Sequence, residues 1–111
     1  MYARVVTMTL RNSTDQSIIK NFSDSLYFHP MYLPLMEELK SRDGFYGKLH
    51  ALIDTIDSVK FVSQVVFTSQ ETLDQYTNED SVQSLWEYIV QLADDKGINV
   101  EVVDTDKYLK F

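Results

Sequence analysis

The fold of this 111-residue chain is decided by residues 44–68, which read GFYGKLHALIDTIDSVKFVSQVVFT. Two segments of this stretch, 45–54 and 59–68, are rich in apolar residues that recur with the period of a β-strand. The polar pair Asp57-Ser58 between them predicts the turn of a hairpin. The second segment carries apolar side chains on both faces, which is typical of a strand that is covered on both sides.

Helical patterns lie on both sides of this hairpin, and a further strand lies outside each of them. Residues 2–10 alternate as a strand, and residues 99–103 read as a short one. The helical stretch before the hairpin should break near Pro30, because proline disfavours helical geometry at the residue before it. The stretch after the hairpin predicts a helix that begins near Ser69, bends part of the way along, and ends at Gly97.

This order of strand, helix, strand, strand, helix, strand predicts an α+β fold, a ferredoxin-like βαββαβ sandwich built on an antiparallel sheet. Two helices can cover only one face of such a sheet, so the apolar side chains on the other face of 59–68 need another cover. We therefore predict a homodimer that forms through the sheet face. Residues 1–111 are expected to form one domain, since this length suits a single core.

Composition and charge exclude several classes of function. The chain contains no cysteine, which excludes disulfides, thiolate metal sites and cysteine nucleophiles. Its net charge is −7 and its basic residues form no stripe, so we expect no nucleic-acid binding. No apolar run approaches the ~18 residues that a membrane span needs, and the start lacks the pattern of a secretory signal. We therefore expect a cytoplasmic protein without a membrane partner.

Two short segments carry a resemblance to a known group of proteins. Residues 41–45, SRDGF, combine a polar turn, a glycine and an aromatic residue at the start of a strand. Residues 65–76, VVFTSQETLDQY, join a strand end to a helix cap and a first helical turn. Together they resemble the dimeric α/β-barrel superfamily, which contains antibiotic-biosynthesis monooxygenases and haem-degrading relatives. The resemblance implies protomers whose sheets face each other to close a barrel, with a ligand pocket between each sheet and its helices.

Within that superfamily, the haem-degrading branch does not fit this chain. That branch carries a haem-ligating histidine on the second helix and a catalytic asparagine on the first strand, where Trp86 and Val6 stand here. Only its helix aromatic, at Tyr76, is retained. The quinone-type monooxygenases of the superfamily need neither metal nor flavin, so the resemblance to them implies no cofactor and no metal site.

His50 is the candidate for proton transfer. It lies in the middle of a predicted strand, on the face expected to carry Tyr46 and Lys48. A general base flanked by a phenol and an ammonium group is chemically reasonable. The alternative is a solvated histidine or one at the edge of an interface. Its distance in sequence from His29, with no carboxylate at ligand spacing, argues against a metal site.

Aromatic side chains supply the candidate ligand contacts. Tyr76 and Trp86 are ten residues apart on the second helical stretch, close to three turns, so they could share a face and stack on a ligand. Core packing is the alternative for both. Tyr32 follows the helix break, where it could line a pocket opening or hold the kinked helix on the sheet.

These observations predict a homodimer that binds a small apolar or aromatic molecule, with His50 as the catalytic residue and Tyr32, Tyr46, Tyr76 and Trp86 as ligand-binding residues. If the protein is an enzyme, the expected activity is that of a cofactor-independent monooxygenase. The alternative is a non-catalytic ligand sensor or assembly module of the same fold. This alternative predicts that aromatic side chains fill the core and leave no cavity.

Overall fold

The protein has the predicted α+β, ferredoxin-like architecture. The structure is a computed structural model, and it describes residues 1–11, 15–27, 29–54 and 59–108. The elements are β1 (Tyr2–Leu10), α1 (Gln16–Tyr27), α2 (Tyr32–Lys40), β2 (Phe45–Asp54), β3 (Val59–Phe67), α3 (Gln70–Thr77), α4 (Asp80–Asp95) and β4 (Ile98–Thr105). Both predicted helical stretches are thus broken into two helices. The turn predicted at Asp57-Ser58 lies outside the described residues.

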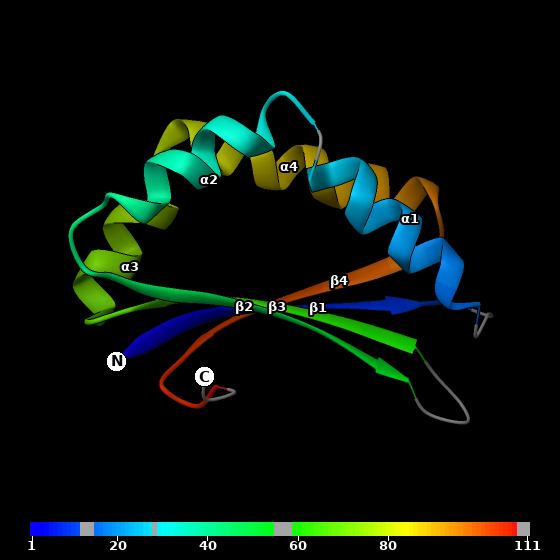
Figure 1. The fold of residues 1–111 in the computed structure, drawn as a ribbon, viewed down its shortest axis with the longest axis horizontal. Coiled ribbons are helices and arrows are strands. Elements are labelled where there is room, and N and C mark those ends of the chain that lie inside the picture. Colours follow the sequence, from blue (N-terminus) through cyan, green and yellow to red (C-terminus); the bar gives the residue numbers. More distant parts are fainter. Residues whose placement is uncertain (12–14, 28, 55–58, 109–111) are drawn as a thin grey trace.

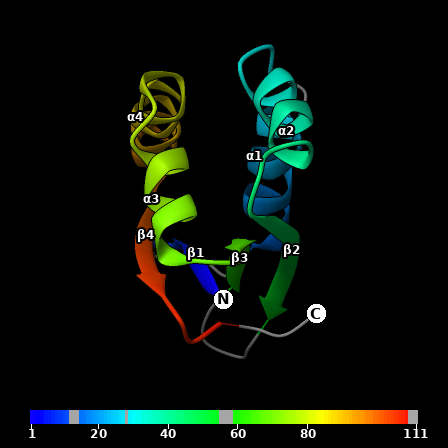
Figure 2. The same ribbon diagram turned by 90° about the vertical axis from the view of Figure 1, so that its left-hand side faces the viewer.

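The strands form one antiparallel sheet in the order β2-β3-β1-β4. The four described helices cover one face of this sheet in two arms, one made of α1 and α2 and the other of α3 and α4 (Figures 1 and 2). We call the opposite side the open face. Residues 106–108, which follow β4, turn beneath it (Figures 1 and 2). No described helix is long and apolar enough to cross a membrane.

The break between α1 and α2 falls where it was predicted, at His29 and Pro30. The His29 imidazole stabilises this break because its Nδ1 accepts a hydrogen bond from the backbone N–H of Met31 at 3.1 Å. The same ring packs against Tyr88 of α4, with ring centroids 4.5 Å apart. The break is therefore a point of contact between the two helical arms.

The core lies between the sheet and the arms, in two clusters of buried side chains. One cluster joins β1 to α1 and α4, and it includes Phe22 and Ile89. The other joins the end of β3 to α2, α3 and α4, and it includes Phe67 and Leu73. Trp86 is partly buried and packs against both clusters, so it marks the place where they meet.

On the open face, β3 receives more cover from its own chain than the sequence suggested. Val62 and Val66 are both buried within the single protomer. Their neighbours on β1 and β2 flank them, because β3 is an inner strand of the sheet. Large apolar side chains stay exposed nearer the edges, at Ile53 of β2 and Val103 of β4. The case for a partner on this face therefore rests on the outer strands more than on β3.

Gly44 fixes the turn that joins α2 to β2. Its φ of +83° lies in the left-handed region, and an added Cβ would lie 2.7 Å from the Cβ of Thr72 on α3. Gly97 has a φ of +74°, but a Cβ there would meet no described atom within 4 Å. A side chain at Gly97 would therefore add backbone strain alone, whereas a side chain at Gly44 would add both strain and a steric clash.

We expect Gly44→Ala to lower the free energy of unfolding by about 2 kcal/mol, because the alanine adds a clash to the strain of a left-handed backbone. Gly97→Ala is the matched control and should lose about 1 kcal/mol, from the strain alone. Urea denaturation measures both. Equal losses would mean that the contact with Thr72 relaxes without cost, contrary to this account.

Candidate functional site

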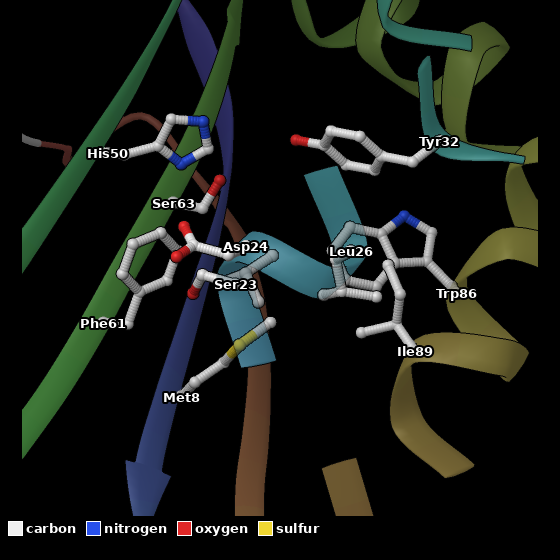
Figure 3. Close-up of a pocket in the computed structure, with 11 residues that line it drawn as sticks. Met8, Ser23, Asp24, Leu26, Tyr32, His50, Phe61, Ser63, Trp86 and Ile89 are labelled. Atoms are coloured by element: carbon white, nitrogen blue, oxygen red, sulfur yellow. The ribbon is translucent and has the colours of Figure 1, made fainter. Parts of the chain in front are cut away.

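A cavity of about 280 Å³ lies between the sheet and the two helical arms (Figure 3). Strands β1, β2 and β3 contribute its floor, and helices α1, α2 and α4 contribute its walls. Most of its side chains are apolar or aromatic, with a few polar groups among them, as is typical of small-molecule sites. The described residues that line it are Val6, Met8, Ser23, Asp24, Leu26, Tyr32, His50, Phe61, Ser63, Trp86 and Ile89.

The strand register brings the floor residues together. Ser63 of β3 pairs with Val6 of β1 on one side and with His50 of β2 on the other, so all three point to the helix-covered face. A bulge shifts the register of β2 between Phe45 and Gly47. A small side chain at Ser63, in the middle of this row, leaves room above the sheet.

His50 and Tyr32 approach the cavity from opposite sides, the first from the sheet and the second from α2 (Figure 3). The His50 imidazole stacks on Phe61, with ring centroids 5.5 Å apart and 23° between the planes. Burial of part of the ring, and then the positive charge of Lys48, lowers the pKa of His50 to about 4. The ring is therefore neutral at pH 7 and can donate or accept a hydrogen bond, but it is a weak base.

Lys48 lies behind the Tyr32 hydroxyl. Its Nζ donates a hydrogen bond to Tyr32 Oη, lies 2.9 Å from Met36 Sδ, and is 4.7 Å from the centroid of the Tyr32 ring. Burial is the main reason, and the charge of Lys40 the second, why the pKa of Lys48 falls to about 8. A hydroxyl that accepts a hydrogen bond from an ammonium group becomes a stronger donor itself. Tyr32 thus presents a polarised hydroxyl to the cavity.

Ser23 adds a second polar point on the wall formed by α1. Its Oγ is buried and has no hydrogen-bond partner within the described part of the chain. Buried hydroxyl groups are normally paired, so this oxygen is an exception among the polar groups near the cavity. Asp24, its neighbour, lines the same cavity and is exposed. Across the residues that the structure describes, no group of three or more His, Asp or Glu side chains gathers as a metal site would require.

Three of the five predicted site residues line this cavity, namely His50, Tyr32 and Trp86. The other two lie elsewhere. Tyr76 is buried in the second core cluster, and Tyr46 is 52% exposed. Their predicted contact with a ligand stays a prediction, and the site described above does not include them.

Sequence reasoning did not single out the small polar side chains of the cavity. Ser23, Asp24 and Ser63 line it, but isolated serines and aspartates occur on many surfaces, and no spacing marks these three. The sequence pattern indicated Lys48 only as a neighbour of His50. The one available signal was a lysine on the same predicted strand face as His50.

No protein-family model matches this chain, and no curated protein matches it in sequence. Solved structures match over nearly its whole length. A dimeric ferredoxin-like protein from an uncultured marine organism has a TM-score of 0.66 at 11% identity, covering 99% of this chain and 96% of its own. An EthD-family protein from Bacillus halodurans has a TM-score of 0.63 at 13% identity, with coverage of 97% and 100%. SnoaB, a cofactor-independent oxygenase from Streptomyces nogalater, has a TM-score of 0.56 at 11% identity, with coverage of 98% and 94%.

Other matching structures are described as antibiotic-biosynthesis monooxygenases, at identities of 7% and 15%. Identities this low establish a shared fold and leave activity open, because one fold hosts many functions. The resemblance carried by residues 41–45 and 65–76 is thus confirmed at the level of the fold. This chain shares the ferredoxin-like fold of these solved structures.

Proposed function

We propose that this protein binds a small, largely apolar aromatic molecule in the cavity between its sheet and its helical arms. The observation that carries the proposal is the cavity itself, about 280 Å³ in volume and lined by side chains from six elements. Ligand sites in proteins begin at roughly 300 Å³, so the size suits a compact ligand. The side chains of Tyr32 and Ser63 in its lining carry hydroxyl groups that can give such a ligand polar contacts.

The catalytic form of this proposal is a cofactor-independent oxygenation of the bound compound. Its support is the fold shared with SnoaB, which is described as a cofactor-independent oxygenase. In such a reaction a CH₂ group becomes a carbonyl, and O₂ gives one oxygen atom to the product and the other to water. Trp86 and His50 would hold the substrate ring. Because the pKa of His50 is lowered to about 4, His50 takes a proton only from an acidic substrate.

The alternative is a non-catalytic ligand sensor or assembly module of the same fold. An assembly module would have a filled core, so the cavity counts against that form. A sensor would have the same cavity as an enzyme and would differ only in turnover. Oxygen consumption in the presence of a bound aromatic compound that carries an oxidisable CH₂ group separates the two. His50→Ala and Trp86→Ala should abolish any such consumption, and unchanged turnover would remove both residues from the proposal.

The proposed functional unit is a homodimer formed through the open face. Its support is a row of side chains that crosses all four strands on that face, Leu49, Gln64, Val5 and Val103 in spatial order. Val103 at the edge of the sheet is exposed in the single protomer. Native mass spectrometry of freshly purified protein reports the number of subunits and any retained ligand in one spectrum. A monomer would contradict this part of the proposal.

Trp86 provides the test of ligand binding, because it is the single tryptophan of the chain and lines the cavity. Nitrobenzene, a neutral aromatic quencher, should therefore quench its fluorescence in a saturable way. Ser63→Phe places a ring on the cavity floor and should weaken this binding by about tenfold or more, a change of about 1.4 kcal/mol. Ser84→Phe is the matched control, because it adds the same ring at an exposed position of α4.

Two results would contradict the cavity as the binding site. Quenching that rises linearly with nitrobenzene concentration in the wild type would mean collision without binding. Saturable quenching of equal strength in Ser63→Phe and in the wild type would place the bound molecule elsewhere.

A further inference from the structure

Lys48 places a positive charge next to Tyr32, which lines the cavity, and it has no counter-ion among the described residues. Its ammonium group donates to Tyr32 Oη and contacts Met36 Sδ. Among the residues that the structure describes, no carboxylate forms an ion pair with it. A partly buried charge of this kind is normally paired, because removing it from water costs free energy that a partner offsets.

The groups around Lys48 increase this cost. Lys40 on α2 carries the same charge and contributes to the lowered pKa of Lys48. His50, two residues along β2, is neutral at pH 7 because its own pKa is lowered. Asp24 lines the cavity but forms no ion pair with Lys48. The chain as a whole has a net charge of −7, yet no described carboxylate forms an ion pair with Lys48.

We propose that the ligand of the cavity carries an ionised hydroxyl on an aromatic ring, and that this phenolate binds at the Tyr32 hydroxyl with Lys48 as its counter-ion. The proposal rests on the proposed function, because it names the chemical class of the molecule that the cavity binds. Tyr32 donates the hydrogen bond, and the ammonium behind it supplies the charge.

The lining favours a phenolate over a carboxylate. The rings of Phe61 and Trp86 line the cavity and offer faces on which an aromatic ligand can stack. The Tyr32 hydroxyl, which accepts a hydrogen bond from the Lys48 ammonium, offers one O–H donor to the cavity, and this suits a single oxygen atom. A carboxylate is held best by the two parallel donors of a guanidinium group, and no arginine lines this cavity.

The test compares 4-nitrophenol with nitrobenzene, a pair that differs only by the hydroxyl group. Trp86 quenching gives the affinity of each, and the visible absorbance of the nitrophenolate gives the ionised fraction of the bound probe. The pH is held near the probe's own pKa. We expect the wild type to bind 4-nitrophenol about tenfold more tightly than nitrobenzene, with its ionised fraction raised on binding.

Lys48→Met should abolish this preference and leave the affinity for nitrobenzene unchanged, which also shows that the variant is folded. Tyr32→Phe keeps the ring and should reduce the preference in the same way. Lys20→Met is the matched control, because it removes the same charge from an exposed position of α1 and should behave as the wild type.

Three outcomes would overturn the inference. If the wild type binds the two probes equally, with no change in ionisation, the cavity does not select a phenolate, and the proposed function stays intact. Tighter binding of benzoate than of 4-nitrophenol would replace the phenolate by a carboxylate. A lack of saturable quenching by either probe would overturn the inference and the proposed function together.

Discussion

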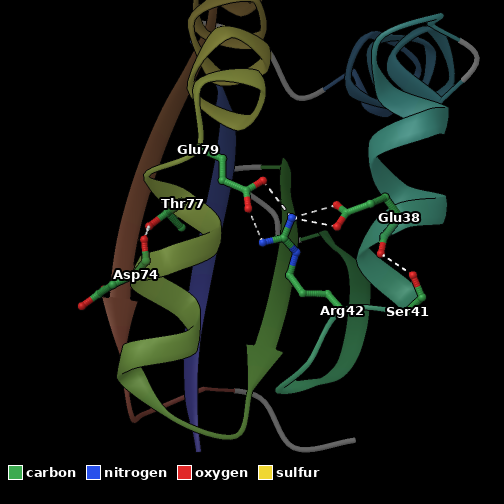
Figure 4. A network of polar contacts seen from close by, with 6 residues as sticks. All are labelled: Glu38, Ser41, Arg42, Asp74, Thr77 and Glu79. Carbon is green, nitrogen blue, oxygen red and sulfur yellow. Dashed lines mark hydrogen bonds and ion pairs between the residues drawn. The ribbon is translucent and has the colours of Figure 1, made fainter.

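Replacing Arg42 with methionine is expected to lower the free energy of unfolding by about 2 kcal/mol. The Arg42 side chain is only 16% exposed and lies between the two helical arms (Figure 4). Its Nη2 donates to Glu38 Oε1 of α2 and to Glu79 Oε2 at the start of α4, each at 2.8 Å. Its guanidinium carbon lies 5.2 Å from the centroid of the Tyr76 ring. Methionine fills much of the same space and leaves both carboxylates without their cation.

The matched control is Arg11→Met. Arg11 pairs with Asp94, but the two side chains are 40% and 70% exposed, so the loss should stay below about 1 kcal/mol. Urea denaturation at pH 7 measures both variants. A loss for Arg42→Met no larger than for Arg11→Met would contradict the central role of Arg42.

The Arg42 contribution should also depend on pH. The hydrogen bond from Arg42 is the main reason why the pKa of Glu79 is lowered. A carboxyl whose pKa is lowered by folding stabilises the fold fully above its ordinary value, and this stabilisation is lost as the pH falls through the lowered value. The difference in the free energy of unfolding between the wild type and Arg42→Met should therefore become smaller as the pH falls.

This ion network bears on the candidate site because it joins the elements that hold the cavity walls. Glu38 belongs to the helix that carries Tyr32, and Glu79 precedes the helix that carries Trp86. The contact between His29 and Tyr88 joins the same two arms at another point. Together the two contacts fix the distance between the walls, so loss of Arg42 should loosen the cavity as well as destabilise the fold.

The order of the elements can be predicted from the sequence because its interruptions are chemically explicit. Pro30 lies in the break after the first helix. The left-handed conformation at Gly97 ends the helix before β4, and that at Gly44 forms the turn into β2. The hairpin of β2 and β3 can be predicted because apolar residues recur in both segments with the period of a β-strand. These signals act within a few residues of chain, so one sequence is sufficient to read them.

The site was predicted only in part, because it depends on contacts between distant elements. The spacing of Tyr76 and Trp86 would place them on one face of a continuous helix, but the helix is broken between Thr77 and Asp80. Tyr76 therefore packs in the second core cluster, whereas Trp86 also reaches the cavity.

Simple alternation along β2 fails for a related reason. The bulge puts Phe45, in place of Tyr46, opposite Phe67 in the register of the sheet. No local sequence pattern predicts this shift in the strand register. The burial of Lys48 is equally hidden, because its hydrogen-bond partners Tyr32 and Met36 come from α2, which packs on β2 from another part of the chain.

Lys48→Met is expected to stabilise the ligand-free protein at pH 7 by up to about 3 kcal/mol. The pKa of Lys48 falls from 10.5 to about 8 in the fold, and one pKa unit corresponds to about 1.4 kcal/mol. Below pH 8 the folded and unfolded states both hold the proton, so the whole cost is present. Between pH 8 and 10.5 only the unfolded state binds it, so the stability of the wild type rises with pH. The advantage of the variant should therefore disappear over this range.

Urea unfolding of the wild type and Lys48→Met at a series of pH values measures this difference, with Lys20→Met as the exposed control. A constant gap between wild type and variant at all pH values would show that Lys48 acts through packing alone. Saturating 4-nitrophenol should reverse the order at pH 7, because the phenolate supplies the missing counter-ion to the wild type only. An apolar side chain of similar length would fill the same space without the charge. If the anionic probe makes the wild type more stable than Lys48→Met, Lys48 serves ligand binding and does not serve the stability of the ligand-free fold.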